Sequence, residues 1–424
     1  MQRMKIMKTY NNMMVAVMVA TAPWGYSGKT PAQPARHMTL EQCIDSALNN
    51  NPAITIKRLE VEKAQTMQAT AFDPGNTSIA LSQDPSSGGN PDNSITLSQS
   101  FDFPTVYAAR HKALKAQTLL SKSSEKMAHH ELRKQITDAY LLLVYTCGVA
   151  DIYRQQQSTY KRFVNIAKTR QETGEGGQLE RINAERAEKD NEMALQQAEV
   201  DKRAAAATLK QLMGAGYYVE PTDTLSFAPT THTNGAFSIE GTPWGEELES
   251  SRNVAEQNKK VAAQAFWPEI SVALRAQTLI KGFNPYHIDR ERFKGDFMGF
   301  EIGVGIPLFY GAKKAKLKAA QKDVEIEKTR RQQTLQAMQR QYEGTRDAYK
   351  KAQARANYFV KEALPQTRKM VNIANEAYEK GEIGYVEYMQ NLQTAATVRL
   401  QTAEALWELN RDGNELNYLQ GYKE

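Results

Sequence analysis

The feature that most constrains this chain is an internal duplication. Residues 164–180 return 207 positions later as residues 371–387, without a gap and with nine of seventeen positions identical. The register continues to Leu212 and Gly214, which correspond to Leu419 and Gly421. A duplication of this length predicts two copies of one structural unit in every protomer.

The duplication includes segments that are not helical. Each copy contains a Phe-x-Pro motif followed by a strand pattern, and the predicted strand pairs lie at about 78–103 and about 269–307. The predicted order of elements in each copy is therefore a helix, a strand pair, a long helix, a glycine turn and a second helix. We divide the chain into a signal peptide (1–28), repeat 1 (29–214), an irregular equatorial linker (215–245) and repeat 2 (246–424).

The N-terminus has the order of a secretory signal peptide. Arg3, Lys5 and Lys8 precede the apolar run 13–20, and small and polar residues follow through Gly28. A disordered Met-rich leader is the alternative. Loss of residues 1–28 removes these three cations and no anion, so the formal charge of +6 becomes +3. A nearly balanced mature chain is poor evidence for nucleic-acid binding.

The two cysteines, Cys43 and Cys147, lie in helical patterns with no local sign of a disulfide. Pairing in an oxidising compartment is possible, but isolated or buried thiols fit better. The Leu-Glu-Gln-Cys sequence before residue 44 has Glu and Gln where a lipid-attachment site needs small residues, which argues against acylation of Cys43.

Two helical stretches are far longer than ordinary globular helices. They run from about 107 to 172 and from about 311 to 379, which is about 100 Å each. From Leu335 the apolar or small positions follow a coiled-coil seam: Met338, Tyr342, Tyr349, Ala352, Ala356 and Phe359. One narrow seam with polar faces predicts a wall one helix thick. Pro365 should bend the second helix.

The strand pairs alternate apolar and polar residues over about ten positions, which is typical of transmembrane β-barrels. No stretch of about 20 uninterrupted apolar residues lies beyond the N-terminus, which excludes a bundle of membrane-spanning helices. Four strands are too few to close a barrel, so closure must involve several protomers. A soluble two-hairpin sandwich that caps a coiled coil is the alternative.

Several segments, in order, resemble the TolC-type outer membrane efflux proteins. Residues 39–52 are similar to the opening signature of that family, residues 101–104 and 305–311 to its strand-to-helix junctions at Pro104 and Pro307, and residues 378–387 to its repeated periplasmic tip motif. The resemblance covers about residues 38–421.

The resemblance implies a mainly helical homotrimer in the cell outer membrane. Each protomer would give four strands to one transmembrane β-barrel, and its long helices would form an α-barrel through the periplasm. It also implies a periplasmic adaptor and an inner-membrane pump, of the RND type, as partners, with outer membrane lipid around the barrel. No enzymatic activity, cofactor, metal or nucleic acid is expected.

The paired glycine turns are the best functional candidates. Gly174 and Gly177 in the first copy, and Gly381 and Gly384 in the second, break a long helix and restart it. A phosphate-binding loop is a poor alternative because no Lys-Ser or Lys-Thr follows and no strand precedes. As hairpin tips they would lie at the periplasmic mouth, where the adaptor docks.

Charged residues beside the turns are candidates for the pore entrance. Glu387 matches the position of an acidic ring in the resembled family, whereas Gln390 stands where a second acid is expected. Glu180 corresponds to Glu387 in the repeat, and Arg181 is a candidate partner for an acid across the tip. Ordinary solvated helix charges are the alternative.

Few other residues suggest a metal site or a binding surface. His129 and His130 are adjacent on a helix, so they point about 100° apart and suit a metal site poorly. Four lysines (Lys313, Lys314, Lys316 and Lys318) follow the last strand and would either touch anionic headgroups or form a solvated helix start.

Three functions fit the sequence. The first is the passive outer membrane channel of a tripartite efflux system for small molecules or metal ions. The second is the duct of a type I protein secretion system, and the third is a periplasmic coiled-coil adaptor without a pore. Two strand pairs at matched positions argue against the third.

Overall fold

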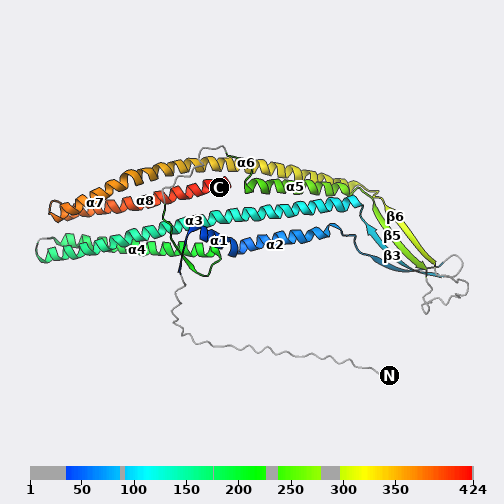
Figure 1. Ribbon diagram of the computed structural model, residues 1–424, viewed down its shortest axis with the longest axis horizontal. Helices are drawn as coiled ribbons and strands as arrows, with labels where there is room; N and C mark the ends of the chain where they lie inside the picture. The colour runs from blue at the N-terminus through cyan, green and yellow to red at the C-terminus, as the bar shows by residue number, and fades with distance from the viewer. Residues whose placement is uncertain (1–34, 86–90, 175, 226–236, 278–296, 423–424) are drawn as a thin grey trace, which may run out of the picture.

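The computed structural model is a long, narrow molecule with helices at one end and a sheet at the other (Figure 1). It describes residues 35–85, 91–174, 176–225, 237–277 and 297–422. The expected signal peptide lies outside these residues. In the first half the main elements are α1 (Leu40–Asn50), α2 (Pro52–Met67), β2 (Ser78–Pro85), β3 (Pro91–Phe101), α3 (Pro104–Glu172) and α4 (Gln178–Met213). In the second half they are α5 (Pro243–Gln264), β5 (Glu269–Gln277), β6 (Phe297–Gly305), α6 (Gly311–Tyr358), α7 (Leu364–Glu379) and α8 (Tyr385–Leu419).

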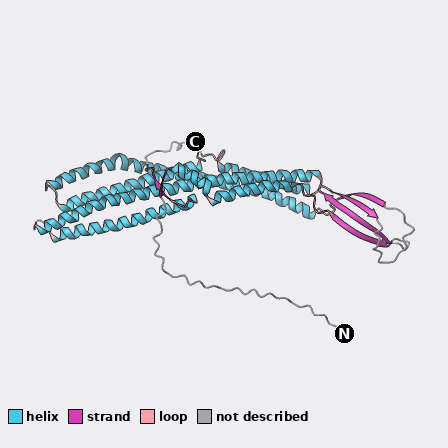
Figure 2. Ribbon diagram, turned by 60° about the horizontal axis from the view of Figure 1, so that its bottom comes forward, coloured by secondary structure: helices cyan, strands magenta, loops and turns pink. Residues whose placement is uncertain are grey.

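The helices form a single layer. Helices α2 and α4 pack on one side of α3, α5 and α8 pack on its other side, and α6 and α7 pack beyond them. The views from two directions agree with this flat arrangement (Figures 1 and 2). The prediction of a wall one helix thick is thus confirmed within the chain. The predicted seam is buried at Met338, Tyr342 and Tyr349, whereas Leu335 is exposed.

Short helices meet end to end to make rods as long as α3. The side chain of Asn51 accepts a hydrogen bond from the Ala53 amide at the start of α2 (2.8 Å) and donates to the Leu212 carbonyl at the end of α4 (2.7 Å). In the second half, Gly421 at the end of α8 abuts Thr242 and Pro243 at the start of α5. Each rod therefore has a joint near the middle of the molecule.

The other long rod bends where the sequence predicts. Residues Phe359–Ala363 form a π-helical turn (η2) between α6 and α7, just before Pro365. Proline has no amide hydrogen to donate, and a wider turn relieves the clash of its ring with the preceding carbonyl. The rod arches at this level in Figure 1.

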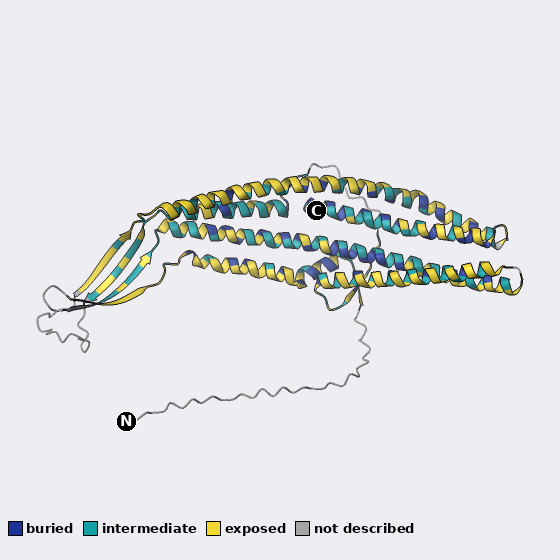
Figure 3. Ribbon diagram, turned by 180° about the vertical axis from the view of Figure 1, so that it is seen from behind, coloured by how far each residue is buried: buried dark blue, intermediate teal, exposed yellow. Residues whose placement is uncertain are grey.

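The four long strands form one antiparallel sheet in the order β2-β3-β5-β6. Ile79, Leu97, Leu274 and Phe300 follow one another across the register and lie on one face. This apolar face is open, with Phe300 77% exposed and Ile79 72% exposed. The opposite face carries small and polar residues, including Ser94, Ser271 and Glu301. Figure 3 shows the exposure along the strands.

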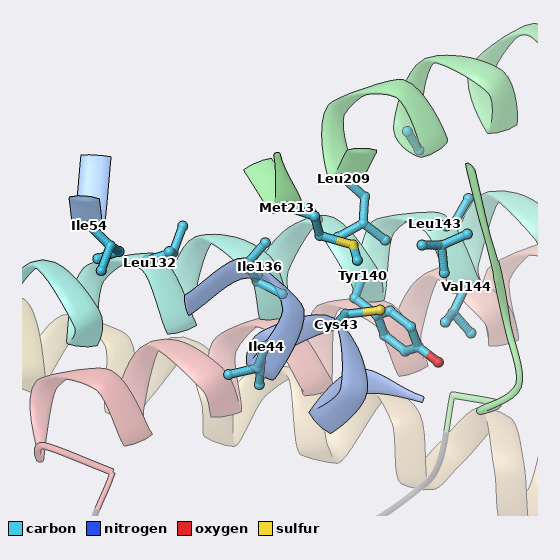
Figure 4. Close-up of a cluster of buried hydrophobic side chains, with 14 residues drawn as sticks. Cys43, Ile44, Ile54, Leu132, Ile136, Tyr140, Leu143, Val144, Leu209 and Met213 are labelled. Atoms are coloured by element: carbon cyan, nitrogen blue, oxygen red, sulfur yellow. The ribbon is translucent and has the colours of Figure 1, made fainter. Parts of the chain in front are cut away.

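A compact core lies where α1 crosses the middle of α3 (Figure 4). Cys43, Ile136, Tyr140, Leu143 and Leu209 are almost fully buried there. Cys43 and Cys147 are both free, as expected. Burial raises the pKa of the Cys43 thiol to about 12, so this cysteine is an inert core residue.

The segment expected to be an irregular linker is partly regular. Residues Tyr218–Pro221 form strand β4, which pairs in parallel with β1 (Ala35–Met38). Asp223 anchors this sheet by accepting hydrogen bonds from the Tyr140 hydroxyl (2.8 Å) and the Leu40 amide (3.0 Å). Pairing with a segment far away in sequence is invisible in the local pattern, which explains why β4 was not predicted.

Within the described part of the chain, one helix, α3, contains an 18-residue window long and apolar enough for a membrane span by composition, with 44% of that window buried inside the molecule. This apolar content supplies the core described above, where Tyr140 and Leu143 belong to α3. It is weak evidence for a membrane span.

Candidate functional site at the helical tips

Two helical hairpins end side by side at the end of the molecule farthest from the sheet (Figure 1). Gly174 lies in the α3–α4 turn with φ +78°, and Gly381 lies in the α7–α8 turn with φ +75°. These left-handed conformations favour glycine, and they reverse the chain after each long helix. Gly177 and Gly384 are the N-cap residues of α4 and α8.

The hydrogen bonds of the two turns differ in detail. The Gly381 amide donates to the Tyr378 carbonyl (3.1 Å), and the Glu382 amide donates to the Ala377 carbonyl (2.8 Å), which together make a Schellman motif. In the first turn the corresponding bond runs from the Gly176 amide to the Arg170 carbonyl (2.9 Å). Its donor and acceptor are one residue farther apart in sequence than those of the Glu382–Ala377 bond. The first turn is therefore wider.

An aromatic cluster joins the two hairpins behind the turns. Phe163 of α3 contacts the rings of Tyr378, Tyr385 and Tyr388, and Tyr378 stacks on Tyr388 with ring centroids 4.6 Å apart. Tyr385 and Tyr388 are buried. The sequence analysis did not single out these tyrosines as site residues, although the i, i+3 spacing of Tyr385 and Tyr388 places both on one side of α8.

Polar groups within this cluster lack partners. The hydroxyls of Tyr378 and Tyr385 are buried without a hydrogen bond among the described residues. Burial, and next the carboxylate of Glu180, raise the pKa of Tyr385 to about 12, so this phenol is neutral in ordinary buffers. Buried polar atoms without partners are energetically unfavourable.

Glu180 lies between the two hairpins. Its side chain is 17% exposed and pairs with Arg170 across the first turn, with 3.5 Å between Oε1 and Nη1. Arg170, Glu180, Tyr378, Tyr385 and Val386 line an open groove of about 740 Å³ between the tips. Of the predicted pore residues, Glu180 is the one within this groove.

Among the described residues, Arg181 forms no ion pair with an acid across the tip. Its Nε donates to Glu185 on its own helix (2.7 Å), and its Nη1 reaches the Gln171 side chain at 3.4 Å. Glu185 lies one turn farther along α4, within easy reach of Arg181. The arginine that pairs with an acid across the turn is Arg170.

Glu387 and Gln390 lie near the start of α8. Both are exposed, and Glu387 has no hydrogen bond or ion pair to its carboxylate among the described residues. Gln390 lines a second groove of about 860 Å³ between α4 and α8. Their role at a pore entrance stays a prediction.

The strand-to-helix junctions differ between the halves. Pro104 occupies the first turn of α3, and the preceding Phe103 stacks on Trp267 with centroids 4.6 Å apart. Pro307 instead lies in an extended segment, and α6 begins only at Gly311. The structure thus places Pro104 within a helix start and Pro307 before one.

Metal binding and histidine chemistry find little support. Within the described ranges, no group of three or more His, Cys, Asp or Glu side chains is arranged to hold a metal ion. His130 is buried, with its Nε2 2.8 Å from the Tyr418 carbonyl and its ring stacked on Tyr418. It is a structural histidine.

Comparison with known proteins identifies the fold. No protein-family model and no curated protein matches the sequence. Among solved structures, a membrane protein from Pseudomonas aeruginosa aligns with a TM-score of 0.73 and 16% identity over 92% of this chain and 98% of that chain. The CmeC outer membrane channel of Campylobacter jejuni aligns with a TM-score of 0.71 and 14% identity over 99% of this chain and 94% of that chain. The chain has the fold of outer membrane channels.

CusC, a protein that forms a transmembrane channel, aligns with a TM-score of 0.70 and 16% identity over 92% of this chain and 96% of its own. The expected resemblance to TolC-type proteins is therefore confirmed for the outer membrane channel fold. Sequence identity this low supports a shared fold, but it does not identify the partners or the cargo.

Proposed function

We propose that this protein is the outer membrane channel of a tripartite efflux system, which passively conducts small molecules or metal ions to the cell exterior. The observation that carries the proposal is the four-stranded sheet at one end of the helical rods, with an exposed apolar face and a small, polar face. Apolar side chains on one face of tilted ten-residue strands match the lipid-facing band of a membrane barrel.

The sheet also has two edges to be paired. Within the described residues, β2 and β6 each bond to one neighbour, so the outer edge of each strand is open. Open edges are unstable in a bilayer, where every backbone polar group needs a partner. Pairing β6 of one copy with β2 of the next closes the barrel. Three copies give the homotrimer that the TolC-type resemblance implies.

In this assembly the layer of helical rods curves into a periplasmic tunnel, and the tips lie at its inner end. A periplasmic adaptor docks on the glycine turns, and an inner-membrane pump, of the RND type, delivers cargo. The groove lined by Arg170, Glu180 and Tyr385 lies beside these turns. Opening then separates the two hairpins and gives the buried tyrosine hydroxyls access to water.

A type I secretion duct has the same architecture and is distinguished by its inner-membrane partner. A periplasmic adaptor without a pore does not account for the exposed apolar sheet, because a soluble domain would bury that face. No specific observation favours either alternative.

The test is fractionation followed by conductance. The full-length protein is expected in the outer membrane fraction, with heat-modifiable migration in gels, and it should form ion channels in planar bilayers. A protein found only in the soluble periplasm, or one that inserts without conducting, would contradict the proposal.

Cation preference in the same bilayers tests Glu387. Three copies of this carboxylate at one constriction attract cations, so Glu387→Gln should reduce the cation-to-anion permeability ratio. Glu343→Gln is the matched control, because it removes the same charge at an exposed site on α6. An unchanged ratio in Glu387→Gln removes Glu387 from the pore entrance.

A further inference from the structure

A basic surface borders the sheet on the side where its strands continue into helices. Lys314, Lys316 and Lys318 at the start of α6 are exposed, and Lys313 is partly exposed. Lys112 and Lys115 near the start of α3 are exposed as well. None of these six lysines has an ion-pair partner among the described residues. We call them the junction lysines.

The helix starts that carry these lysines contain no acidic residues. Residues 104–124 of α3 contain no Asp or Glu, and neither do residues 311–322 of α6. Elsewhere the chain pairs its cations locally, as in Lys322 with Glu325 (2.7 Å) and Lys189 with Glu192 (2.7 Å). At the first junction, Asp102 pairs with Arg110 (3.0 Å) and not with one of these lysines.

Two of the junction lysines, Lys313 and Lys314, lie in the first turn of α6 and do not stabilise it. Cations near a helix N-terminus are repelled by its dipole, and acidic residues are preferred there. Neither α3 nor α6 has an acid in its first turn. This surface therefore offers unpaired cations to an anion outside the chain.

Apolar side chains lead from the sheet directly to this basic surface. Phe309 is 90% exposed and Leu308 is 77% exposed, and both lie between β6 and α6. Ile302 and Val304 of the apolar sheet face shortly precede them in the chain. The surface thus changes from apolar to cationic along a few residues, as it does where a membrane protein leaves the hydrocarbon and enters the headgroup layer.

We propose that the junction lysines bind the headgroups of anionic glycerophospholipids, such as phosphatidylglycerol, in the periplasmic leaflet of the outer membrane. This inference rests on the proposed function, because it places the sheet in that membrane. The ligand is a lipid phosphate diester. The adjoining Leu308 and Phe309 contact its acyl chains, which a free phosphate lacks.

The test compares two quadruple variants of the full-length protein. Lys313→Gln, Lys314→Gln, Lys316→Gln and Lys318→Gln are combined in the first. The control combines Lys328→Gln, Lys350→Gln, Lys351→Gln and Lys369→Gln, which changes the net charge equally at exposed sites farther from the sheet. Native mass spectrometry measures adducts of phosphatidylglycerol, with phosphatidylcholine as the neutral probe.

Phosphatidylglycerol should bind the wild type and the control alike, and the first variant at least about tenfold more weakly, while phosphatidylcholine binding stays unchanged. Equal binding by both variants, or equal binding of the two lipids by the wild type, overturns the inference. Conductance in planar bilayers is recorded for each protein. A wild type that conducts but shows no lipid preference contradicts this inference alone, whereas a wild type that neither inserts nor conducts contradicts the proposed function as well.

Discussion

At the scale of single residues, His130 ties the end of α8 to α3. Its ring is stacked on Tyr418 and meets the edge of Tyr422, and its Nε2 lies beside the Tyr418 carbonyl. Burial lowers the pKa of His130, and the nearby Arg133 acts in the same direction, whereas the carbonyl opposes them. The native state therefore favours the neutral imidazole.

This preference predicts a pH-dependent stability. The unfolded chain binds a proton at His130 near pH 6.5, whereas the native state resists it, so stability is lost as pH falls below about 6.5. His130→Gln removes the titration and should flatten the fall in melting temperature. Burial raises the pKa of the adjacent Glu131, which acts in the opposite direction but equally in both proteins. Parallel melting curves in the two proteins from neutral to acid pH would contradict the assignment.

At the scale of elements, the glycine turns illustrate how a backbone conformation selects a residue. Gly381 has φ +75° in the Schellman motif that ends α7. Gly384, three residues later, has φ −78° and open space where a Cβ atom would stand. Gly381 therefore needs the conformational freedom of glycine, whereas Gly384 does not.

Gly381→Ala should destabilise the second tip by about 1 kcal/mol, because an L-residue is strained in the left-handed region. Gly384→Ala is the matched control and should be nearly neutral. Hydrogen exchange of the amides at the ends of α7 and α8 measures the local effect, and the melting temperature measures the global one. Equal protection in both variants would show that the turn is not the stabilising feature.

Much of the structure at the level of helices and strands could be predicted from the sequence. The long helices, the strand pairs and the bend before Pro365 follow from periodicity, alternation and proline chemistry, all of which are local. The pairing of β4 with β1 could not be predicted, because it joins segments about 180 residues apart. At the tips, the sequence pointed to Arg181, but helix geometry places Glu185 within its reach and leaves Arg170 beside Glu180.

At the scale of the whole molecule, the two faces of the sheet predict which surface meets lipid. Ile302 and Glu301 are neighbours on β6 and point to opposite faces. Ile302 is 66% exposed on the apolar face. In the proposed barrel Ile302 faces lipid and Glu301 faces the lumen.

Ile302→Arg should therefore cost about 2–4 kcal/mol of barrel stability and deplete the protein from the outer membrane fraction. Glu301→Arg introduces the same side chain one position earlier and should be incorporated normally. Heat-modifiable migration of the fractionated protein distinguishes the two outcomes. Equal incorporation of both variants would show that the apolar face is not the lipid-facing surface.

The open edges of β2 and β6 have a consequence for biogenesis. A single chain carries an uncovered apolar face flanked by strand edges, and such surfaces promote aggregation in water. In the proposed function each newly exported chain crosses an aqueous compartment before it meets its neighbours and the lipid. Its yield then depends on periplasmic holding chaperones, and it competes with proteolysis until assembly covers the sheet.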